Sequence, residues 1–293
     1  MKMLYFPGCT LKTSAKNLEK TAFAIMDKLG HELKEMDDWV CCGVVSSLSG
    51  DDLMRHLAPL RSLIHVEDQG EKKVITLCDM CYNTLKQTNL RVKEIPDDLE
   101  TLNDFMDQEN DYKKTVEVYH FLEFLRDEIG FARLKKMVKN PLDGLKIMPY
   151  YGCMLLRPRE VAIDDAEDPT IMSDLLNALG AEVIDNPFKI ECCGSYHTIE
   201  NKNIVINRAH RITNFAIERD ADAIMLSCPL CRFNIDERGK EAEKLYKGYK
   251  QIPVYYYTQL IAISLGIDPT VCGFDQHAVD PNLLLKRKGV YKK

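Results

Sequence analysis

The stretch WVCCG stands at residues 39–43, and a near copy, IECCG, stands at residues 190–194. Each copy belongs to a set of five cysteines, with the spacings C-x31-CC-x35-C-x2-C and C-x38-CC-x34-C-x2-C. The two sets are Cys9, Cys41, Cys42, Cys78 and Cys81, and Cys153, Cys192, Cys193, Cys228 and Cys231. Scattered cysteines that only fill a core would show no such order. Ten of the eleven cysteines therefore indicate an internal repeat, and only Cys272 lies outside it.

The residues around the cysteines repeat as well. MLYFPGC (3–9) parallels IMPYYGC (147–153), and VITLCDMCYN (74–83) parallels IMLSCPLCRFN (224–234). The period is about 150 residues, which is the size of a whole domain rather than of a solenoid repeat. The chain is therefore predicted to be a duplication of one domain.

Each half has the pattern of an α/β domain. Short β-branched or aromatic runs, such as KMLYFPGC and KKVITLC, end at the cysteines. Helical patterns such as 17–30 and 170–180 lie between them and end in Leu-Gly. The turn-forming stretch KNPLDG (139–144) marks the boundary. We expect two duplicated, Rossmann-like α/β domains, at residues 1–143 and 144–293, with the cysteines at the carboxyl ends of parallel strands.

Two apolar stretches are expected to complete the halves. The charged region from 95 to 145 is predicted to be mostly helical, and VYHFLEFLRDEIG (118–130) within it to complete the first domain. VYYYTQLIAISLG (254–266) is predicted to be part of a buried helix in the second domain. It is too short for the ~20 apolar residues of a membrane span.

Composition restricts the class of protein. The formal net charge of −6 over 293 residues gives no electrostatic reason to expect nucleic acid as a partner. The first residues lack the apolar region and cleavage site of a signal peptide. We therefore expect a cytoplasmic protein without membrane insertion. In a reducing compartment its cysteines are expected to be metal ligands rather than disulfides.

Five thiols in each half point to a particular kind of metal centre. A zinc ion closes with four ligands, so one cysteine of each set would be left over. Adjacent side chains in an extended segment leave on opposite faces. A vicinal pair therefore more readily binds two different irons, or bridges two irons through one of its sulfurs, than it binds a single ion. Gly43 and Gly194, which follow the pairs, permit unusual backbone angles and close approach of N–H groups. These features predict a polynuclear iron–sulfur cluster in each half.

The repeated motif resembles the cysteine-rich CCG domain, and nearly the whole chain resembles the B subunits of heterodisulfide reductases from methanogenic archaea. The resemblance implies one noncubane [4Fe-4S] cluster in each half, held by the five cysteines of that half. It further implies reduction of the mixed disulfide of coenzyme M and coenzyme B to two thiols, with the disulfide between the clusters and one electron from each.

The electron donor is expected to be another protein. The sequence contains neither the C-x2-C-x2-C-x3-C-P run of ferredoxins nor a G-x-G-x-x-G dinucleotide fingerprint. The resemblance implies that the neighbour in the same complex is a ferredoxin-like iron–sulfur protein, the C subunit, and that a flavin-containing protein, the A subunit, lies behind it.

Substrate-binding residues are expected beside the cysteines, at positions where the halves differ. Both coenzymes carry acidic groups, which cations and N–H donors recognise. Lys12 follows Cys9 and Arg157 follows Cys153, while His197 lies in GSYHT (194–198), where the first half has GVVSS (43–47). Lys12, Arg157 and His197 are therefore the candidate substrate contacts. Catalysis by a side chain alone is not expected, and Cys272 is expected to be a buried thiol.

Three alternatives stay open. In the first alternative, the chain is the electron-transfer subunit of another CCG-domain oxidoreductase, which acts on succinate, lactate, glycolate, glycerol phosphate or a quinone. In the second, it is a zinc-binding scaffold. In the third, one half holds a cluster and the other a zinc ion. Iron and zinc contents of the protein discriminate between these alternatives.

Overall fold

The computed structural model describes residues 1–44, 52–107 and 109–291. It contains two four-stranded parallel sheets, with strand orders β2-β1-β3-β4 and β6-β5-β7-β8. The strands are β1 (Lys2–Phe6), β2 (Glu32–Glu35), β3 (Lys73–Thr76), β4 (Glu117–His120), β5 (Lys146–Tyr150), β6 (Glu182–Val183), β7 (Ala223–Leu226) and β8 (Val254–Tyr256). The identical order in both halves confirms the predicted pair of duplicated α/β domains.

The helices connect the strands and cover the sheets. The α-helices are α1 (Gly8–Leu11), α2 (Lys16–Lys28), α3 (Leu57–Asp68), α4 (Asp79–Glu94), α5 (Pro96–Phe105), α6 (Phe121–Phe124), α7 (Phe131–Met137), α8 (Ile171–Leu179), α9 (Lys202–Glu218), α10 (Pro229–Arg232), α11 (Gly239–Ala242), α12 (Tyr257–Ser264) and α13 (Pro281–Arg287). Shorter 3₁₀ and π turns are η2 (Met54–His56), η3 (Leu125–Ile129), η4 (Arg159–Val161), η5 (Ser195–His197), η6 (Phe233–Arg238), η7 (Pro269–Cys272) and η8 (Phe274–Gln276). None of the helices in the described ranges has the length and apolar character to cross a bilayer.

The central strands are buried because helices cover both faces of the sheets. In β1, Leu4, Tyr5 and Phe6 are at most 2% exposed, and all four residues of β7 are buried. Continuous apolar runs such as these are typical of parallel strands, whereas strands with one wet face alternate. The runs that the sequence places before the cysteines therefore form the middle of each sheet.

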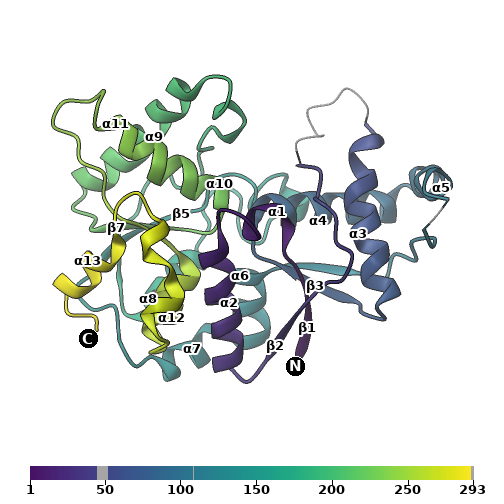
Figure 1. Ribbon diagram of the computed structural model, residues 1–293, viewed down its shortest axis with the longest axis horizontal. Coiled ribbons are helices and arrows are strands. Elements are labelled where there is room, and N and C mark those ends of the chain that lie inside the picture. Colours follow the sequence, from purple (N-terminus) through teal and green to yellow (C-terminus); the bar gives the residue numbers. More distant parts are fainter. Residues whose placement is uncertain (45–51, 108, 292–293) are drawn as a thin grey trace.

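Helices from both halves form the layer between the two sheets. Figure 1 shows α2, α6, α7, α8 and α12 in the middle of the molecule, between the β1–β3 side and the β5–β7 side. Helix α2 of the first half packs against α12 of the second, and Thr21 donates a 2.7 Å hydrogen bond to Thr258 there. In the same way α7 packs against α8. The two halves thus share one interior.

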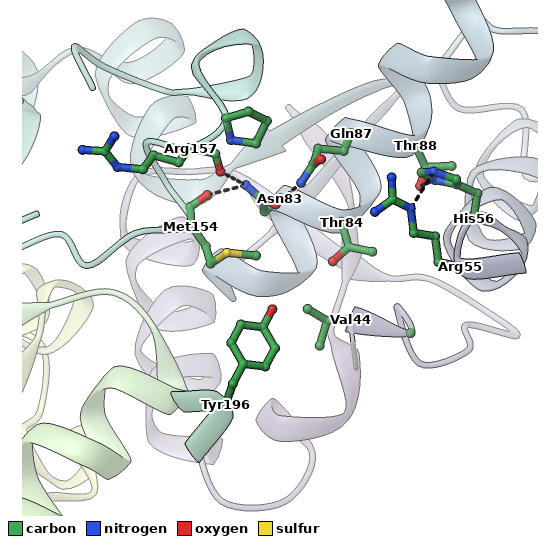
Figure 2. A pocket seen from close by; sticks show the side chains of 12 residues that line it. Val44, Arg55, His56, Asn83, Thr84, Gln87, Thr88, Met154, Arg157 and Tyr196 are labelled. Atoms are coloured by element: carbon green, nitrogen blue, oxygen red, sulfur yellow. Dashed lines mark hydrogen bonds between the residues drawn. The ribbon is translucent and has the colours of Figure 1, made fainter. Parts of the chain in front are cut away.

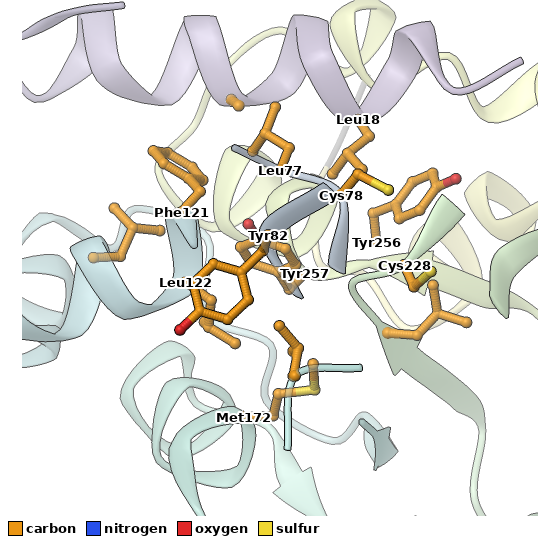
Figure 3. Packing of buried hydrophobic residues seen from close by; sticks show 14 of the residues in the cluster. Leu18, Leu77, Cys78, Tyr82, Phe121, Leu122, Met172, Cys228, Tyr256 and Tyr257 are labelled. Atoms are coloured by element: carbon orange, nitrogen blue, oxygen red, sulfur yellow. The ribbon is translucent and has the colours of Figure 1, made fainter. Parts of the chain in front are cut away.

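The packing at the centre of this interior joins side chains from both halves. Figure 3 shows Leu77, Tyr82 and Phe121 of the first half close to Met172, Tyr256 and Tyr257 of the second. All six are fully buried. The predicted boundary at residues 143 and 144 lies between α7 and β5, and this division into domains stays a prediction.

The predicted buried helix in the second terminal stretch is confirmed as α12, whose residues are all buried, but the start of each terminal stretch differs from the sequence prediction. Both were expected to be helical, but each begins as a strand, β4 and β8, which pairs with the central strand β3 or β7. The strand passes directly into a helix, at Phe121 in the first half and at Tyr257 in the second. Valine and tyrosine favour strands, and strands of three or four residues leave too few positions for an alternating pattern to appear.

Candidate iron–sulfur centre

The cysteines of the first set lie at the carboxyl ends of three neighbouring strands. Cys9 is in α1 immediately after β1, the vicinal pair follows β2, and Cys78 and Cys81 lie at the start of α4 after β3. The order β2-β1-β3 brings these three turns to one edge of the sheet. Ligand sites of parallel α/β folds form at this edge, so the fold assembles five thiols that are distant in sequence.

The second set repeats the arrangement. Cys153 follows β5, the vicinal pair follows β6, and Cys228 precedes α10 while Cys231 lies within it, after β7. The strand order β6-β5-β7 again places the three turns side by side. The carboxyl-end placement of the cysteines is therefore confirmed in both halves, whereas their role as ligands stays a prediction.

Within each set some of the thiols are in contact. Cys41 Sγ lies 4.0 Å from Cys9 Sγ, and Cys231 Sγ lies 3.5 Å from Cys193 Sγ. In each set the second cysteine of the vicinal pair is buried. Across the described ranges no three Cys, His, Asp or Glu side chains form a group that could hold a single metal ion.

Glycines permit the close approach of these turns. A Cβ atom on Gly8 would lie 2.7 Å from Cys81 Sγ, and one on Gly152 would lie 3.2 Å from Cys231 Sγ. Both glycines have positive φ angles, 68° and 67°. Each turn that carries the first cysteine of a set therefore lies directly against the C-x2-C turn. Gly43 and Gly194 also have positive φ, 70° and 85°, as the sequence predicts.

The thiols affect one another's protonation. Hydrogen bonds from the Cys41 and Cys81 thiols lower the pKa of Cys42 to about 4. Those from Cys153 and Cys193 lower the pKa of Cys192 to about 2. Contacts with the Cys228 and Cys81 thiols also lower the pKa of Cys78. A thiolate is the form of cysteine that binds metals, so each set contains at least one thiol whose surroundings favour the ligand form.

The donor chemistry of each set fits an iron–sulfur cluster. Five sulfur donors converge on one edge of a sheet, and the glycines let the turns that carry them approach one another closely. Iron–sulfur clusters are held by cysteine thiolates, and contacts such as the 3.3 Å one from Gly194 N–H to Cys192 Sγ are of the type that tunes them. Asn234 likewise donates to Cys193 Sγ over 3.3 Å.

A cavity of about 340 Å³ lies between the two halves, and residues next to cysteines of both sets form its walls. Figure 2 shows side chains from α4 and η2 of the first half facing those of the segment after β5 and of η5. The lining residues are Gly43, Val44, Arg55, His56, Asn83, Thr84, Gln87, Thr88, Met154, Arg157, Pro158 and Tyr196. Gly43 directly follows Cys42 and Met154 directly follows Cys153. The cavity, called the interdomain cavity below, therefore borders both sets.

The three candidate substrate contacts have different positions. Arg157 lines the interdomain cavity, but its guanidinium points away from it in Figure 2 and pairs with Glu167 at 3.2 Å. His197 is exposed in η5, and its neighbour Tyr196 lines the cavity instead. Lys12 lines a different depression, with Glu19 and Glu35 as ion-pair partners. The structure thus does not bring the three residues together. In the stretch GVVSS (43–47), which corresponds to GSYHT in the second half, residues 45–47 lie outside the described residues.

Several residues that line the interdomain cavity could not be identified from the repeated cysteine motif. Arg55 and His56 lie in the long interval between Cys42 and Cys78, and no spacing marks them. Asn83, by contrast, is the last residue of the repeated stretch VITLCDMCYN (74–83). Its amide donates to the carbonyls of Met154 at 2.8 Å and Arg157 at 2.6 Å, so it ties α4 to the second half. Cys272 is fully buried at the end of η7, which confirms the predicted buried thiol.

Relatives with known names span nearly the whole chain. The chain is 30% identical over 282 residues to the 8-methylmenaquinol:fumarate reductase membrane anchor subunit of Wolinella succinogenes, covering 96% of this chain and 98% of the relative. It is also 30% identical over 288 residues to the B subunit of the ferredoxin/F420H2-dependent CoB–CoM heterodisulfide reductase of Methanosarcina acetivorans, covering 95% and 94%. The predicted resemblance to B subunits of heterodisulfide reductases is confirmed.

A solved structure shares the fold. A hypothetical protein from Helicobacter pylori superimposes with a TM-score of 0.76 at 14% identity, covering 94% of this chain and 51% of that one.

The profile of the cysteine-rich domain, CCG, matches residues 3–86 and 147–236, which contain the two cysteine sets. The chain, with one match in each half, belongs to the cysteine-rich domain family.

Proposed function

We propose that this protein is the iron–sulfur subunit of an oxidoreductase complex and reduces the coenzyme M–coenzyme B disulfide to two thiols. The observation that carries the proposal is the position of the interdomain cavity, which residues adjacent to Cys42 and Cys153 border. A disulfide bound there would have one cysteine set on each side. The similarity to the B subunit of a CoB–CoM heterodisulfide reductase supports this substrate.

Each cysteine set would hold one noncubane [4Fe-4S] cluster, and each cluster would supply one electron. The reaction consumes two electrons and two protons: the S–S bond breaks and two S–H bonds form. Duplication of the domain matches this stoichiometry. The ligands would be Cys9, Cys41, Cys42, Cys78 and Cys81 in the first half, and Cys153, Cys192, Cys193, Cys228 and Cys231 in the second.

Partner proteins would deliver the electrons. We propose that a ferredoxin-like iron–sulfur protein contacts this chain and that a flavin-containing protein of the same complex lies behind it. Relatives named as subunits of ferredoxin-dependent reductases support membership of such a complex. The isolated chain is expected to accept electrons from a one-electron dye but not from a nicotinamide.

The test is metal analysis combined with a substrate comparison. Anaerobically prepared protein should contain about eight irons per chain, as two four-iron clusters require, and no zinc. A reduced viologen dye should be oxidised when the heterodisulfide is added. Zinc in place of iron would establish the scaffold alternative, and iron without disulfide-dependent dye oxidation would contradict the substrate.

A second candidate is electron transfer to or from a quinone. It is favoured by the equally high identity to the anchor subunit of a methylmenaquinol:fumarate reductase, which covers 98% of that relative. The same dye assay with a menaquinone analogue discriminates the two. Oxidation with the quinone but not with the heterodisulfide would support the second candidate.

A further inference from the structure

We propose that Arg55 is the anion-binding residue of the interdomain cavity, and that the molecule bound there carries a carboxylate, sulfonate or phosphate directed toward the first half. The proposal deepens the proposed function, on which it rests for the reaction that follows binding. The binding site itself is inferred from the side chains alone.

Of the residues that line the interdomain cavity in the described part of the chain, two are cationic. The Arg157 guanidinium points away from the cavity and is paired with Glu167 (Figure 2). The Arg55 side chain comes from η2 and lies on the side of the cavity that Thr84 and Thr88 of α4 also line (Figure 2). Arg55 is therefore the cation that a ligand in the cavity would meet.

Two buried polar residues hold Arg55 in place. Arg55 Nε lies 3.2 Å from His56 Nε2, and His56 Nδ1 lies 2.7 Å from Thr88 Oγ1. Because an arginine Nε–H can only donate, His56 Nε2 must accept, and Nδ1–H then donates to the threonine. Burial, aided by the charges of Arg55 and Arg91, lowers the pKa of His56 to about 4 and keeps it a neutral acceptor. The guanidinium is thereby preorganised, which reduces the entropy lost when a ligand binds.

Among the described residues, the charge of Arg55 is only partly compensated. Its Nη2 pairs with Asp52 at 2.9 Å, but the Asp52 side chain is 63% exposed and also binds Arg91 Nη1 at 2.6 Å. Exposed ion pairs of this kind contribute little free energy. An anion in the interdomain cavity can therefore compete with Asp52, and a fork of N–H donors suits the two or three oxygens of an acidic group.

The opposite wall of the interdomain cavity, formed by the second half, is mainly apolar. Met154 and Pro158, from the segment after β5, and Tyr196, from η5, present a thioether and two rings. One end of the cavity is thus cationic and the other mainly apolar. This asymmetry fits an unsymmetrical ligand that has an acidic end toward the first half and a less polar part toward the second.

The experiment compares Arg55→Met with Arg91→Met. Both arginines pair with Asp52, but only Arg55 lines the cavity, so Arg91→Met is the matched control. Binding of mercaptoethanesulfonate and of neutral mercaptoethanol to the complete, anaerobically prepared protein is measured by calorimetry. Arg55→Met should weaken sulfonate binding roughly 10- to 100-fold, the loss of a charge-assisted hydrogen bond, and leave the neutral thiol unaffected.

Two further variants separate a binding role from a structural one. Arg55→Lys keeps the charge but loses the Nε–H bond to His56, so its loss should be intermediate. Asp52→Asn removes the competing carboxylate and should tighten sulfonate binding a few-fold. Weaker binding in Asp52→Asn, equal losses in Arg55→Met and Arg91→Met, or no sulfonate binding by the wild type would each overturn the proposal.

The outcome also separates this proposal from the proposed function. Arg55-dependent sulfonate binding without heterodisulfide reduction would keep the site and reject the reaction. Reduction with unchanged kcat/KM in Arg55→Met would keep the reaction and reject Arg55 as its anion-binding residue.

Discussion

Ser227 donates a 2.7 Å hydrogen bond to the carboxylate of Asp79, and both residues are only 1% exposed. Ser227 immediately precedes Cys228, and Asp79 immediately follows Cys78, so the bond joins the two C-x2-C turns across the boundary between the halves. The thiols of these cysteines also interact: a hydrogen bond from Cys228 is the largest of the effects that lower the pKa of Cys78. The two cysteine sets are therefore held at a fixed separation.

Ser227→Ala should destabilise the protein. The change leaves a buried carboxylate without one of its donors, which costs about 1–3 kcal/mol. The free energy of unfolding in urea under anaerobic conditions measures this loss. Ser264→Ala is the matched control, because the buried Ser264 hydroxyl has no partner among the described residues and its removal should not destabilise the protein. Equal effects of both changes would contradict the role given to the Ser227–Asp79 bond.

Gly8→Ala should disturb the first cysteine set. The new Cβ would lie 2.7 Å from Cys81 Sγ, so α1 must move away from α4 and carry Cys9 with it. Gly30→Ala controls for backbone strain, since Gly30 also has positive φ, 77°, but open space around the Cβ position. We expect iron content to fall in Gly8→Ala and to be unchanged in Gly30→Ala, apart from a stability loss of about 1 kcal/mol. Full iron content in Gly8→Ala would show that the turn can adjust.

Cys41→Ala and Cys193→Ala should each remove only the cluster of their own half. The reason is that each half contains a complete set of five cysteines at its own sheet edge. Iron counts should show that each variant loses the iron of one cluster. In low-temperature spectra, the features that one variant loses should be those that the other keeps. Loss of both clusters from either single change would mean that the sets are interdependent.

The stability of the protein should fall as the pH decreases from 6.5 to 4, in part because of His56. Its pKa is about 4 in the folded state and about 6.5 when unfolded, so between these values the unfolded chain binds a proton that the folded one does not. Protonation therefore favours unfolding, and the contribution of His56 is fully present only above about pH 6.5. His56→Gln, which does not titrate, should show a smaller decline in urea midpoint over this range. Parallel declines would exclude His56 as a source.

The fold and the placement of the cysteines follow from the sequence, whereas most of the cavity does not. The cysteine spacings repeat, and each set follows a buried strand, so parallel topology alone brings the thiols together. Arg55 and His56 lie in the turn η2 and Thr88 lies in α4, and only tertiary packing joins them. Lys12 is near a cysteine in sequence, but Glu19 on α2 and Glu35 on β2 hold it at another depression. Nearness to a cysteine in sequence does not determine which side of the turn a residue faces.

The packing of helix α2 of the first half against helix α12 of the second bears on how a duplicated chain of this kind could arise. A single half would leave the face of α2 that packs on α12 exposed to solvent. Two identical halves could cover this face by forming a symmetrical dimer. In such a dimer, every residue near the axis has to be compatible with its own copy. Once the halves are joined, that requirement ends: Asp79 in the first half corresponds to Pro229 in the second. Fusion thus converts a structure with two equivalent faces into one that can distinguish the two ends of a single molecule.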